Sequence, residues 1–391
     1  MSRLLVEIGC EELPYRTCES FVRQLEGAEG APGLVRALLE EERLLAPGAE
    51  VRALVSPRRV AVVVSEVPDR QTARVERFRG PRAEVAFAPD GSLTKAGAGF
   101  ARARGAQPED VRREVVDGGE FAVVEVEAPR RPAREVLPGL VARLVTGLQV
   151  PRGMRWDQRP PGEEEYLRFA RPIRWLVCKL GAETVTGTFY GLGIGDRSRG
   201  HRVLGGPLTV DDAARYEELL REGGVVVDQE ERRRLILAGL DAAAAAAGGT
   251  WSDPGGVLAE AVYLAEWPTV AAGRFDPRHL RLPDPVLVTA MQSHQRYFPV
   301  RGQGGALLPV FLYVSNADPR AEAEVTRGNE RVLDGRLDDA EFAWDRDLAE
   351  GIEAMASRLG AVVFHERLGS LADKARRLGG LVAWLAGGQP G

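Results

Sequence analysis

Cysteine is scarce in this sequence, and long apolar runs are missing. The three cysteines among 391 residues are Cys10, Cys18 and Cys178, and their odd number and wide spacing fit neither a disulfide framework nor a zinc site. No segment reaches the roughly 18 uncharged apolar residues of a membrane-spanning helix. The opening residues MSRLLVEIGCEELP also lack the apolar region of a signal peptide. We therefore expect reduced thiols and a cytoplasmic protein that does not enter a membrane.

The common catalytic and cofactor motifs are missing as well. No G-x-x-x-x-G-K-[ST] phosphate loop and no G-x-S-x-G nucleophile turn occurs in the sequence. The stretch GLGIGD begins like a dinucleotide fingerprint, but Asp196 or Ser198 stands where its third glycine is needed. The four histidines have no partner at metal-ligand spacing. These absences predict no catalytic residue, no metal site and no cofactor bound by this chain.

Lysine is also rare, so that almost all of the positive charge is carried by arginine. Lysine occurs only at positions 95, 179 and 374, and the net charge is −5. That balance argues against non-specific binding of nucleic acid, although it leaves room for a local basic surface, because charges are screened over about 8–10 Å. Arginine offers a planar fork that matches phosphate wherever it clusters.

One such cluster lies at residues 152–202, which hold nine arginines and one lysine against six acids. Aromatic residues alternate with these basic side chains, and basic groups beside aromatic faces are typical of RNA-binding surfaces. A solvated arginine-rich face above core aromatics would give the same composition, so both interpretations stand. The aromatic residues are Trp156, Tyr166, Phe169, Trp175, Phe189 and Tyr190.

The periodicity predicts a multidomain α+β protein with mixed and antiparallel sheets and packed helices. We expect an N-terminal domain at 1–150, a central domain at 151–318 that carries the basic segment, and a helical segment at 319–391. The strands expected include 4–8, 51–56, 58–67 and 225–227, and a hairpin is expected to turn at 117–119. Residues 191–202 are expected to form a glycine-rich loop.

Helix boundaries follow from capping signals. Asp228 with Glu231 three residues later predicts a capping box, and Asp284 with Pro285 predicts an N-cap followed by proline at the first helical position. After a hairpin turned by GQGG, one long charged helix is expected from Pro319 to about Leu348. Its predicted apolar stripe is Val325, Val332, Leu333, Leu337 and Ala340.

The stretch AMQSHQRYFPV (290–300) places polar side chains at an apolar junction between a helix and a strand. Buried polar groups must be hydrogen-bonded, solvated or used by a ligand. His294, Gln295 and Arg296 therefore form either a polar seam, in which His294 caps helix carbonyls, or a set of donors facing RNA.

Ten collinear segments across the chain resemble those of the beta subunit of bacterial glycyl-tRNA synthetase. They are LLVEIGCEELP (4–14), SPRRVAV (56–62), MRW (154–156), FARPIRWLV (169–177), SRGHRVLG (198–205), AEWPTVAAGRFD (265–276), MQSHQRYFPV (291–300), FLYVSNAD (311–318), GNERVLDGRLDDAEF (328–342) and LGSLADKARR (368–377).

The resemblance implies a non-catalytic subunit of glycine–tRNA ligase. In that family the alpha subunit uses ATP and Mg to form the adenylate. The beta subunit supplies most of the recognition of tRNA(Gly), in an assembly of two alpha and two beta chains. The family's beta chain continues into an HD-type helical domain and an anticodon-binding domain, so this sequence is expected to be its N-terminal portion. Cys10 stands where the family usually has Thr.

The resemblance and the local charge together nominate two sets of residues. The first is expected to contact tRNA: Arg155, Arg171, Arg174, Arg197, Arg199, His201, Arg202, His294, Gln295 and Arg296. The second is expected to dock the alpha subunit: Asn329, Glu330, Arg331 and Arg336. The competing interpretations are arginines paired with acids such as Glu163–Glu165, and a solvated helix face with i,i+4 ion pairs.

Two other functions compete with the beta-subunit role. A stand-alone RNA-binding protein derived from a synthetase would have the same basic segment. A metal-dependent phosphohydrolase would need an HD-type cluster of His and Asp, before which this chain ends. Hydrolytic editing has little use for glycine, because a tight pocket excludes larger amino acids sterically.

Overall fold

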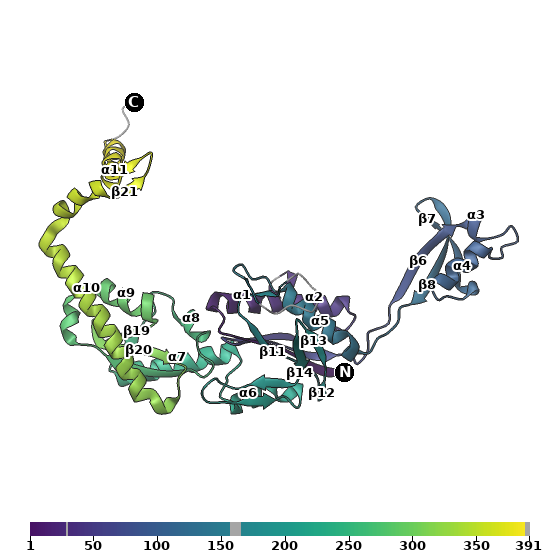
Figure 1. The fold of residues 1–391 in the computed structure, drawn as a ribbon, viewed down its shortest axis with the longest axis horizontal. Helices are drawn as coiled ribbons and strands as arrows, with labels where there is room; N and C mark the ends of the chain where they lie inside the picture. The colour runs from purple at the N-terminus through teal and green to yellow at the C-terminus, as the bar shows by residue number, and fades with distance from the viewer. Residues whose placement is uncertain (29, 157–165, 388–391) are drawn as a thin grey trace. The chain divides into compact units, whose positions relative to one another are not determined.

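The computed structural model describes residues 1–28, 30–156 and 166–387 (Figure 1). It confirms the α+β prediction. The chain divides into two compact units, Met1–Arg233 with Val262–Trp267, and Arg234–Ala261 with Pro268–Gly391. This division does not coincide with the predicted segments 1–150, 151–318 and 319–391. In particular, the first strand pairs with a strand that follows residue 150. In the described residues no helix has a stretch long and apolar enough to cross a membrane.

The first unit is built on a mixed sheet with the strand order β13-β14-β11-β1-β5-β4, with β12 paired to β11. β1 (Ser2–Cys10) lies between β5 (Arg59–Val67) and β11 (Ile173–Leu180), antiparallel to both. It is buried from Leu4 onward because it is apolar on both faces. The outer strands are β4 (Val51–Ser56), β12 (Glu183–Thr184), β13 (Gly187–Phe189) and β14 (Leu192–Gly195).

Helices and extended segments cover this sheet. α1 (Tyr15–Glu26), α2 (Leu34–Glu41) and α5 (Ala133–Gly147) lie together over the sheet, and α2 contacts both of the others (Figure 1). A core cluster joins Leu5, Trp175 and Val177 of the sheet to Tyr216 and Leu220 of α6 (Tyr216–Glu222). The burial of these side chains is the main stabilising term of the unit.

Residues 75–127 form a second small sheet with a core of its own. β8 (Gly119–Glu127) pairs on either side with β6 (Val75–Arg82) and β7 (Arg112–Val116). α3 (Ala83–Ala86) and α4 (Lys95–Ala103) pack on it. The predicted hairpin is confirmed, because Asp117 and Gly118 both adopt positive φ values between β7 and β8.

Two predictions in the first unit are wrong. Residues 191–202 were expected to be a loop, but they carry β14, which runs parallel to β11, and β15 (Arg197–Arg199), which pairs with β16 (Pro207–Thr209). Residues 225–227 were expected to be a strand, but they belong to no sheet. This segment is nevertheless buried, and the Val226 amide donates to the Glu266 carbonyl at 2.8 Å.

The smallest elements of the first unit are two-stranded or single-turn. They are β2 (Gly27–Ala28) with β3 (Ala31–Pro32), β9 (Met154–Arg155) with β10 (Arg168–Phe169), and the 3-10 turns at Pro108–Asp110 and Ala213–Arg215.

The second unit has a four-stranded sheet in the order β17-β19-β20-β18. The predicted hairpin is confirmed as β19 (Phe298–Arg301) and β20 (Leu307–Ser315). β17 (Thr250–Trp251) and β18 (Thr269–Arg274) flank it. The neighbouring helices are α7 (Gln229–Ala246), α8 (Leu258–Val262) and α9 (Asp284–Gln295). α9 begins one residue earlier than predicted: Pro283 is its N-cap, and Asp284 is its first helical residue and pairs with Arg301.

The predicted long helix is α10 (Glu322–Arg358), which is interrupted at Gly351, where φ is 75°. Leu333 and Leu337 are buried in the core of the unit as expected, whereas Val332 is 46% exposed and does not belong to the apolar stripe. A 3-10 turn at Pro319–Ala321 precedes the helix. Beyond it lie another 3-10 turn (Leu359–Ala361), β21 (Val363–His365), β22 (Gly369–Ser370) and α11 (Leu371–Ala386).

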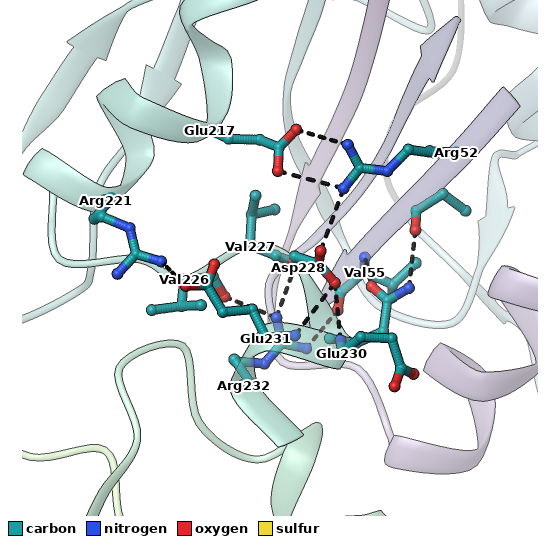
Figure 2. Close-up of polar contacts among 12 residues, drawn as sticks. Arg52, Val55, Glu217, Arg221, Val226, Val227, Asp228, Glu230, Glu231 and Arg232 are labelled. Carbon is teal, nitrogen blue, oxygen red and sulfur yellow. Dashed lines mark hydrogen bonds and ion pairs between the residues drawn. The ribbon is translucent and has the colours of Figure 1, made fainter. Parts of the chain in front are cut away.

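A buried arginine ties the start of α7 to the rest of the first unit (Figure 2). Arg232 is fully buried and donates to the carbonyls of Val55, Val226, Val227 and Val262 at 2.6–2.9 Å. Burial lowers the pKa of Arg232 to about 10, so it is still protonated at neutral pH. These four bonds connect β4, the extended segment 225–227 and Val262, all within the first unit.

The cap of α7 is only half of the predicted capping box. The Asp228 carboxylate accepts from the amides of Glu230 at 2.8 Å and Glu231 at 3.4 Å, as an N-cap should. Glu231 does not bond back to Asp228; it pairs with Arg221 of α6 (Figure 2).

Replacing Arg232 should destabilise the protein strongly. Arg232→Ala leaves four buried carbonyls without their donor and opens a cavity, so we expect a loss of about 4 kcal/mol in the free energy of unfolding. Arg233→Ala removes the same charge from an exposed neighbour and should change that free energy by less than about 0.5 kcal/mol. Urea unfolding of both variants is the measurement, and equal effects would contradict a structural role for Arg232.

Candidate functional site: an arginine-lined cleft

The first unit contains a cleft of about 660 Å³ whose lining is rich in arginine. It is formed where the start of β11, the strand β15 and the turn after β15 meet the segments around Glu11 and Arg58. Five arginines and one acid line it, so that a chain of net charge −5 concentrates positive charge here. The lining residues are Glu11, Arg58, Arg174, Trp175, Arg197, Ser198, Arg199, Gly200, His201, Arg202, Gly205, Gly206 and Pro207.

A fully buried ion network lies beneath the cleft. Arg59 donates from Nε to Glu266 Oε1 at 2.9 Å and from Nη1 to Glu7 Oε1 at 3.3 Å, and all three residues are at most 1% exposed. Ser56 also donates to Glu266, at 2.8 Å. Burial by itself would raise the pKa of Glu266, but the charge and hydrogen bond of Arg59 outweigh it and the pKa is lowered.

This network positions two residues of the cleft wall. Glu7 accepts from Trp175 Nε1 at 2.7 Å and from Ser198 Oγ at 2.9 Å. Trp175 lies directly against Gly9, where an added Cβ would stand 1.8 Å from Trp175 Cε2. Only glycine therefore lets the indole lie on β1 and reach Glu7. The Arg199 guanidinium sits over the same indole, 5.4 Å from the ring centroid, in a cation–π contact.

Arg58 is the most deeply placed arginine of the lining. It is 8% exposed, and its Nε and Nη1 atoms have no hydrogen-bond partner among the described residues. Its nearest acid is Glu266, with Oε2 3.6 Å from Nη1. Burial lowers the pKa of Arg58, and the attraction of Glu266 is opposed by the neighbouring cations Arg59 and Arg202. Arg58 is thus a cation at the floor of the cleft that has a long ion pair with Glu266 and, within the described residues, no hydrogen bond from Nε or Nη1.

Two of the rim arginines are held by acids. Arg174 pairs with Glu11 at 3.1 Å, and Arg202 pairs with Glu11 at 2.6 Å and Glu12 at 2.9 Å. The interpretation in which arginines pair with acids therefore holds for these two, with Glu11 and Glu12 as the partners. The suggested partners Glu163–Glu165 lie outside the described residues.

The other two rim arginines are less constrained. Arg197 donates to Thr209 Oγ1 at 2.8 Å and lies 3.7 Å from Asp196. Arg199 is exposed and forms no ion pair with any residue in the described ranges. Because β15 places Arg197 and Arg199 two residues apart, both point to the same side of the strand.

His201 has a structural role in the turn after β15. It is 2% exposed, and its Nδ1 accepts from the amides of Val203 at 3.2 Å and Leu204 at 3.1 Å. Gly200 and Gly205 approach the Gly223 carbonyl so closely that a Cβ on either would stand within 2.6 Å of it. Glycine and histidine thus fix the shape of this turn.

The cleft brings together Arg174, Arg197, Arg199, His201 and Arg202 from the predicted set. It does not include Arg155 or Arg171. Arg155 is exposed on β9, and Arg171 donates to the carbonyls of Ala170 and Glu12. The sequence prediction missed Arg58, Glu7 and Glu11. The position of Glu7 within the apolar run LLVEI could have indicated a buried, paired carboxylate.

The stretch 290–300 lies in the second unit and is largely a polar seam. Gln292 is buried; it donates to Asp253 at 2.8 Å and accepts from the Gly255 amide at 2.7 Å. Arg296, in the left-handed conformation, donates to the His294 carbonyl and pairs with Glu260. Arg296, and not His294 as suggested from the sequence, therefore covers a carbonyl at the helix end.

His294 and Gln295 face α10. His294 is exposed and lines a groove of about 510 Å³ together with Arg336. Gln295 lies beside the Arg336 guanidinium. In the amide orientation that turns the Gln295 oxygen toward Arg336, this oxygen accepts from Arg336 Nε at 2.7 Å.

The residues predicted to dock a partner are mostly engaged within the second unit. Asn329 accepts from the Tyr297 hydroxyl at 2.9 Å, Glu330 accepts from the Arg274 amide at 2.9 Å, and Arg336 lies beside Gln295. Arg331 is exposed and forms no ion pair within the described part of the chain. Of the four, it is the residue with a charge available to a partner, and docking stays a prediction.

A cluster that the sequence did not suggest joins His279 to Asp338 and Glu341 of α10. One ligand atom of each lies within 4.8 Å of the others, and His279 is fully buried. Arg278 already pairs with Asp338, and Arg281 with Glu341 at 2.5 Å. These guanidiniums hold the carboxylates in an ion-pair network between the 3-10 turn Pro277–Arg281 and α10.

The cysteines do not contribute a nucleophile. All three are free and buried. Burial raises the pKa of Cys18 and of Cys178 to about 12 and that of Cys10 well above its ordinary value. At neutral pH they remain thiols, which are poor nucleophiles.

Residues 4–390 match the model of the family described as "Glycyl-tRNA synthetase beta subunit". The α+β chain with its basic cleft is thus a protein of the aminoacyl-tRNA synthetase class. It belongs to the glycyl-tRNA synthetase beta subunit family, which confirms the resemblance seen in the ten sequence segments.

Named relatives agree with this assignment. The glycine–tRNA ligase beta subunit of Moorella thermoacetica is 39% identical over 376 residues, which are 96% of this chain and 52% of that protein. Those of Desulfitobacterium hafniense strain Y51 and Bacillus subtilis are each 37% identical, over 387 and 385 residues; both alignments take in 98% of this chain, and they take in 53% and 54% of the relatives. The chain spans about half the length of the curated relatives it matches.

The ion network should make stability depend on acid pH through Glu266. Because its pKa is lowered in the folded state, Glu266 contributes full stability above its unfolded pKa of about 4.5, and the contribution is lost as pH falls through the folded value. Glu266→Gln should cost about 3 kcal/mol at pH 7, and this deficit should shrink below pH 4.5. Denaturant unfolding at pH 7 and pH 3.5 measures it, and a deficit that is constant with pH would show that the charge of Glu266 is not used.

Proposed function

We propose that this chain acts within glycine–tRNA ligase as the tRNA-binding and alpha-binding portion of the beta subunit, and that it does not form the adenylate itself. The cleft carries this proposal. It gathers arginines from segments far apart in the sequence, while the chain as a whole is acidic. A predominantly basic cluster on a sheet is suited to binding a phosphate backbone.

The chemistry of the rim supports RNA as the ligand. Arginine forks pair with phosphate oxygens, and a guanidinium stacked on an indole presents its outer face to an unpaired base. Arg199 has that arrangement over Trp175. An acidic protein partner would suit the arginines equally well, but it would have no use for the stacking face.

The partner and cofactors follow from the family. We propose that ATP and Mg are used on the alpha subunit, that the working assembly has two alpha and two beta chains, and that it acts in the cytoplasm in protein biosynthesis. Arg331 on α10 is the contact we propose for the alpha subunit. The alternative is a stand-alone RNA-binding protein, and co-purification with a class II alpha chain distinguishes the two.

Loss of Arg199 should weaken tRNA binding in a salt-dependent way. Arg199→Ala in the alpha–beta assembly removes about one phosphate contact, so the slope of log affinity against log salt should fall by about one. Arg215→Ala is the matched control, since Arg215 is exposed and already paired with Asp211 at 2.6 Å. Filter binding of tRNA(Gly) between 50 and 200 mM salt is the measurement. If Arg199→Ala folds normally and binds with unchanged affinity and slope, the cleft is not the tRNA site.

The chain alone should not activate glycine. The sequence contains no phosphate loop, so we expect no ATP–pyrophosphate exchange with glycine from the purified chain, and exchange on addition of the alpha subunit. The alpha subunit assayed alone is the control for contamination. Exchange by this chain without alpha would refute the division of labour proposed here.

A further inference from the structure

The floor of the cleft holds a cation whose ion pair within the described residues, to Glu266 at 3.6 Å, is longer than a hydrogen bond. Arg58 is 8% exposed, it lines the cleft, and two of its buried nitrogens have no hydrogen-bond acceptor among the described residues. A buried donor without a partner costs free energy, and a buried charge costs more. A ligand that supplies the acceptor removes this free-energy cost in the bound state.

The neighbouring acids give the side chain of Arg58 no hydrogen bond within the described residues. Glu7 accepts from Arg59, Trp175 and Ser198, and the Oε1 atom of Glu266 accepts from Arg59 and Ser56. The closest approach of Glu266 to Arg58 is 3.6 Å, too long for a hydrogen bond. Glu11 on the rim is taken by Arg174 and Arg202. Glu266 therefore pairs with Arg58 only at long distance, and no described carboxylate forms a two-bond contact with its guanidinium.

We propose that the floor of the cleft binds one phosphate group carried on an unpaired nucleotide, with Arg58 as the inner ligand and Arg199 as the outer one. This inference rests on the proposed tRNA-binding function and names the part of the RNA that the cleft takes. Phosphate oxygens accept two parallel N–H bonds from one guanidinium, which is the pattern that the free Nε edge of Arg58 offers.

The shape of the cleft selects an unpaired nucleotide over a duplex. A volume of about 660 Å³ suits one nucleotide. A duplex is far wider than such a pocket and presents its phosphates on the outside, so it reaches rim residues such as Arg197 but not the buried Arg58. The base of an inserted nucleotide has a stacking surface in the outer face of Arg199, whose inner face lies on Trp175.

The test is calorimetric titration of the full 391-residue chain with AMP, adenosine and inorganic phosphate, and with a single-stranded RNA and its duplex form. We expect AMP and the single strand to bind, phosphate to compete with AMP, and adenosine and the duplex to bind at least tenfold more weakly. Arg58→Lys keeps the charge but loses the fork, and should weaken AMP binding at least tenfold. Arg199→Gln should weaken it at least fivefold, and Arg215→Ala less than twofold.

Several results overturn the proposal. They are AMP binding that is insensitive to both Arg58→Lys and Arg199→Gln, adenosine that binds as well as AMP, and duplex that binds as well as single strand. If Arg58→Lys fails to fold, the exposed Arg199→Gln alone decides. Competition between AMP and the single strand assigns the phosphate to RNA, whereas AMP binding without competition assigns it to a free nucleotide and refutes the RNA source.

The two proposals fail separately. If tRNA affinity falls in Arg199→Ala while Arg58→Lys leaves AMP affinity unchanged, the tRNA function stands and the proposed phosphate site at the floor of the cleft is wrong. If Arg58→Lys weakens AMP binding while Arg199→Ala leaves tRNA affinity unchanged, the floor of the cleft is a nucleotide site and the assignment of the cleft to tRNA is wrong.

Discussion

The contact of Arg59 with Glu7 and Glu266 is the interaction on which the cleft depends. It is fully buried and joins β1, β5 and the segment 262–267. Two carboxylates around one guanidinium leave acceptor capacity on Glu7, and that capacity holds Trp175 and Ser198 in place. Removing one member of such a network leaves an uncompensated buried charge. The wall of the site is thus supported by electrostatics as well as by packing.

Three buried arginines of the first unit are stabilised in three different ways. Arg59 is neutralised by carboxylates, and Arg232 is surrounded by four backbone carbonyls. Arg58 has only a long ion pair with Glu266, at 3.6 Å, and it is the one of the three that lines the cleft. Arg59 and Arg232 therefore stabilise the fold, whereas Arg58, which lines the cleft, is the one that we propose binds a ligand. The three arginines have the same charge, so only their surroundings distinguish their roles.

Local signals predicted the local structure well. The hairpin at 117–119 and the hairpin after α9 follow from their turn residues, and periodicity predicts α10, although the helix continues past the predicted end near Leu348 to Arg358. The strand β14 was missed because its partner β11 is parallel and distant, and glycine-rich sequence reads as a loop. Arg58 was missed because it stands at the first position of the expected strand 58–67, and its burial depends on Trp175 and Glu266, which lie more than a hundred residues away.

The contact between Gly9 and Trp175 has a consequence for how the site can vary. The Trp175 indole can occupy its position because Gly9, on the neighbouring strand, has no Cβ. Any side chain at residue 9 would push the ring away from Glu7 and tilt the surface on which Arg199 rests. The chemistry of the cleft is therefore encoded partly in a residue that never touches its contents. Substitution of the rim arginines can change the ligand preference of the cleft, whereas any side chain larger than that of glycine at residue 9 would change its geometry.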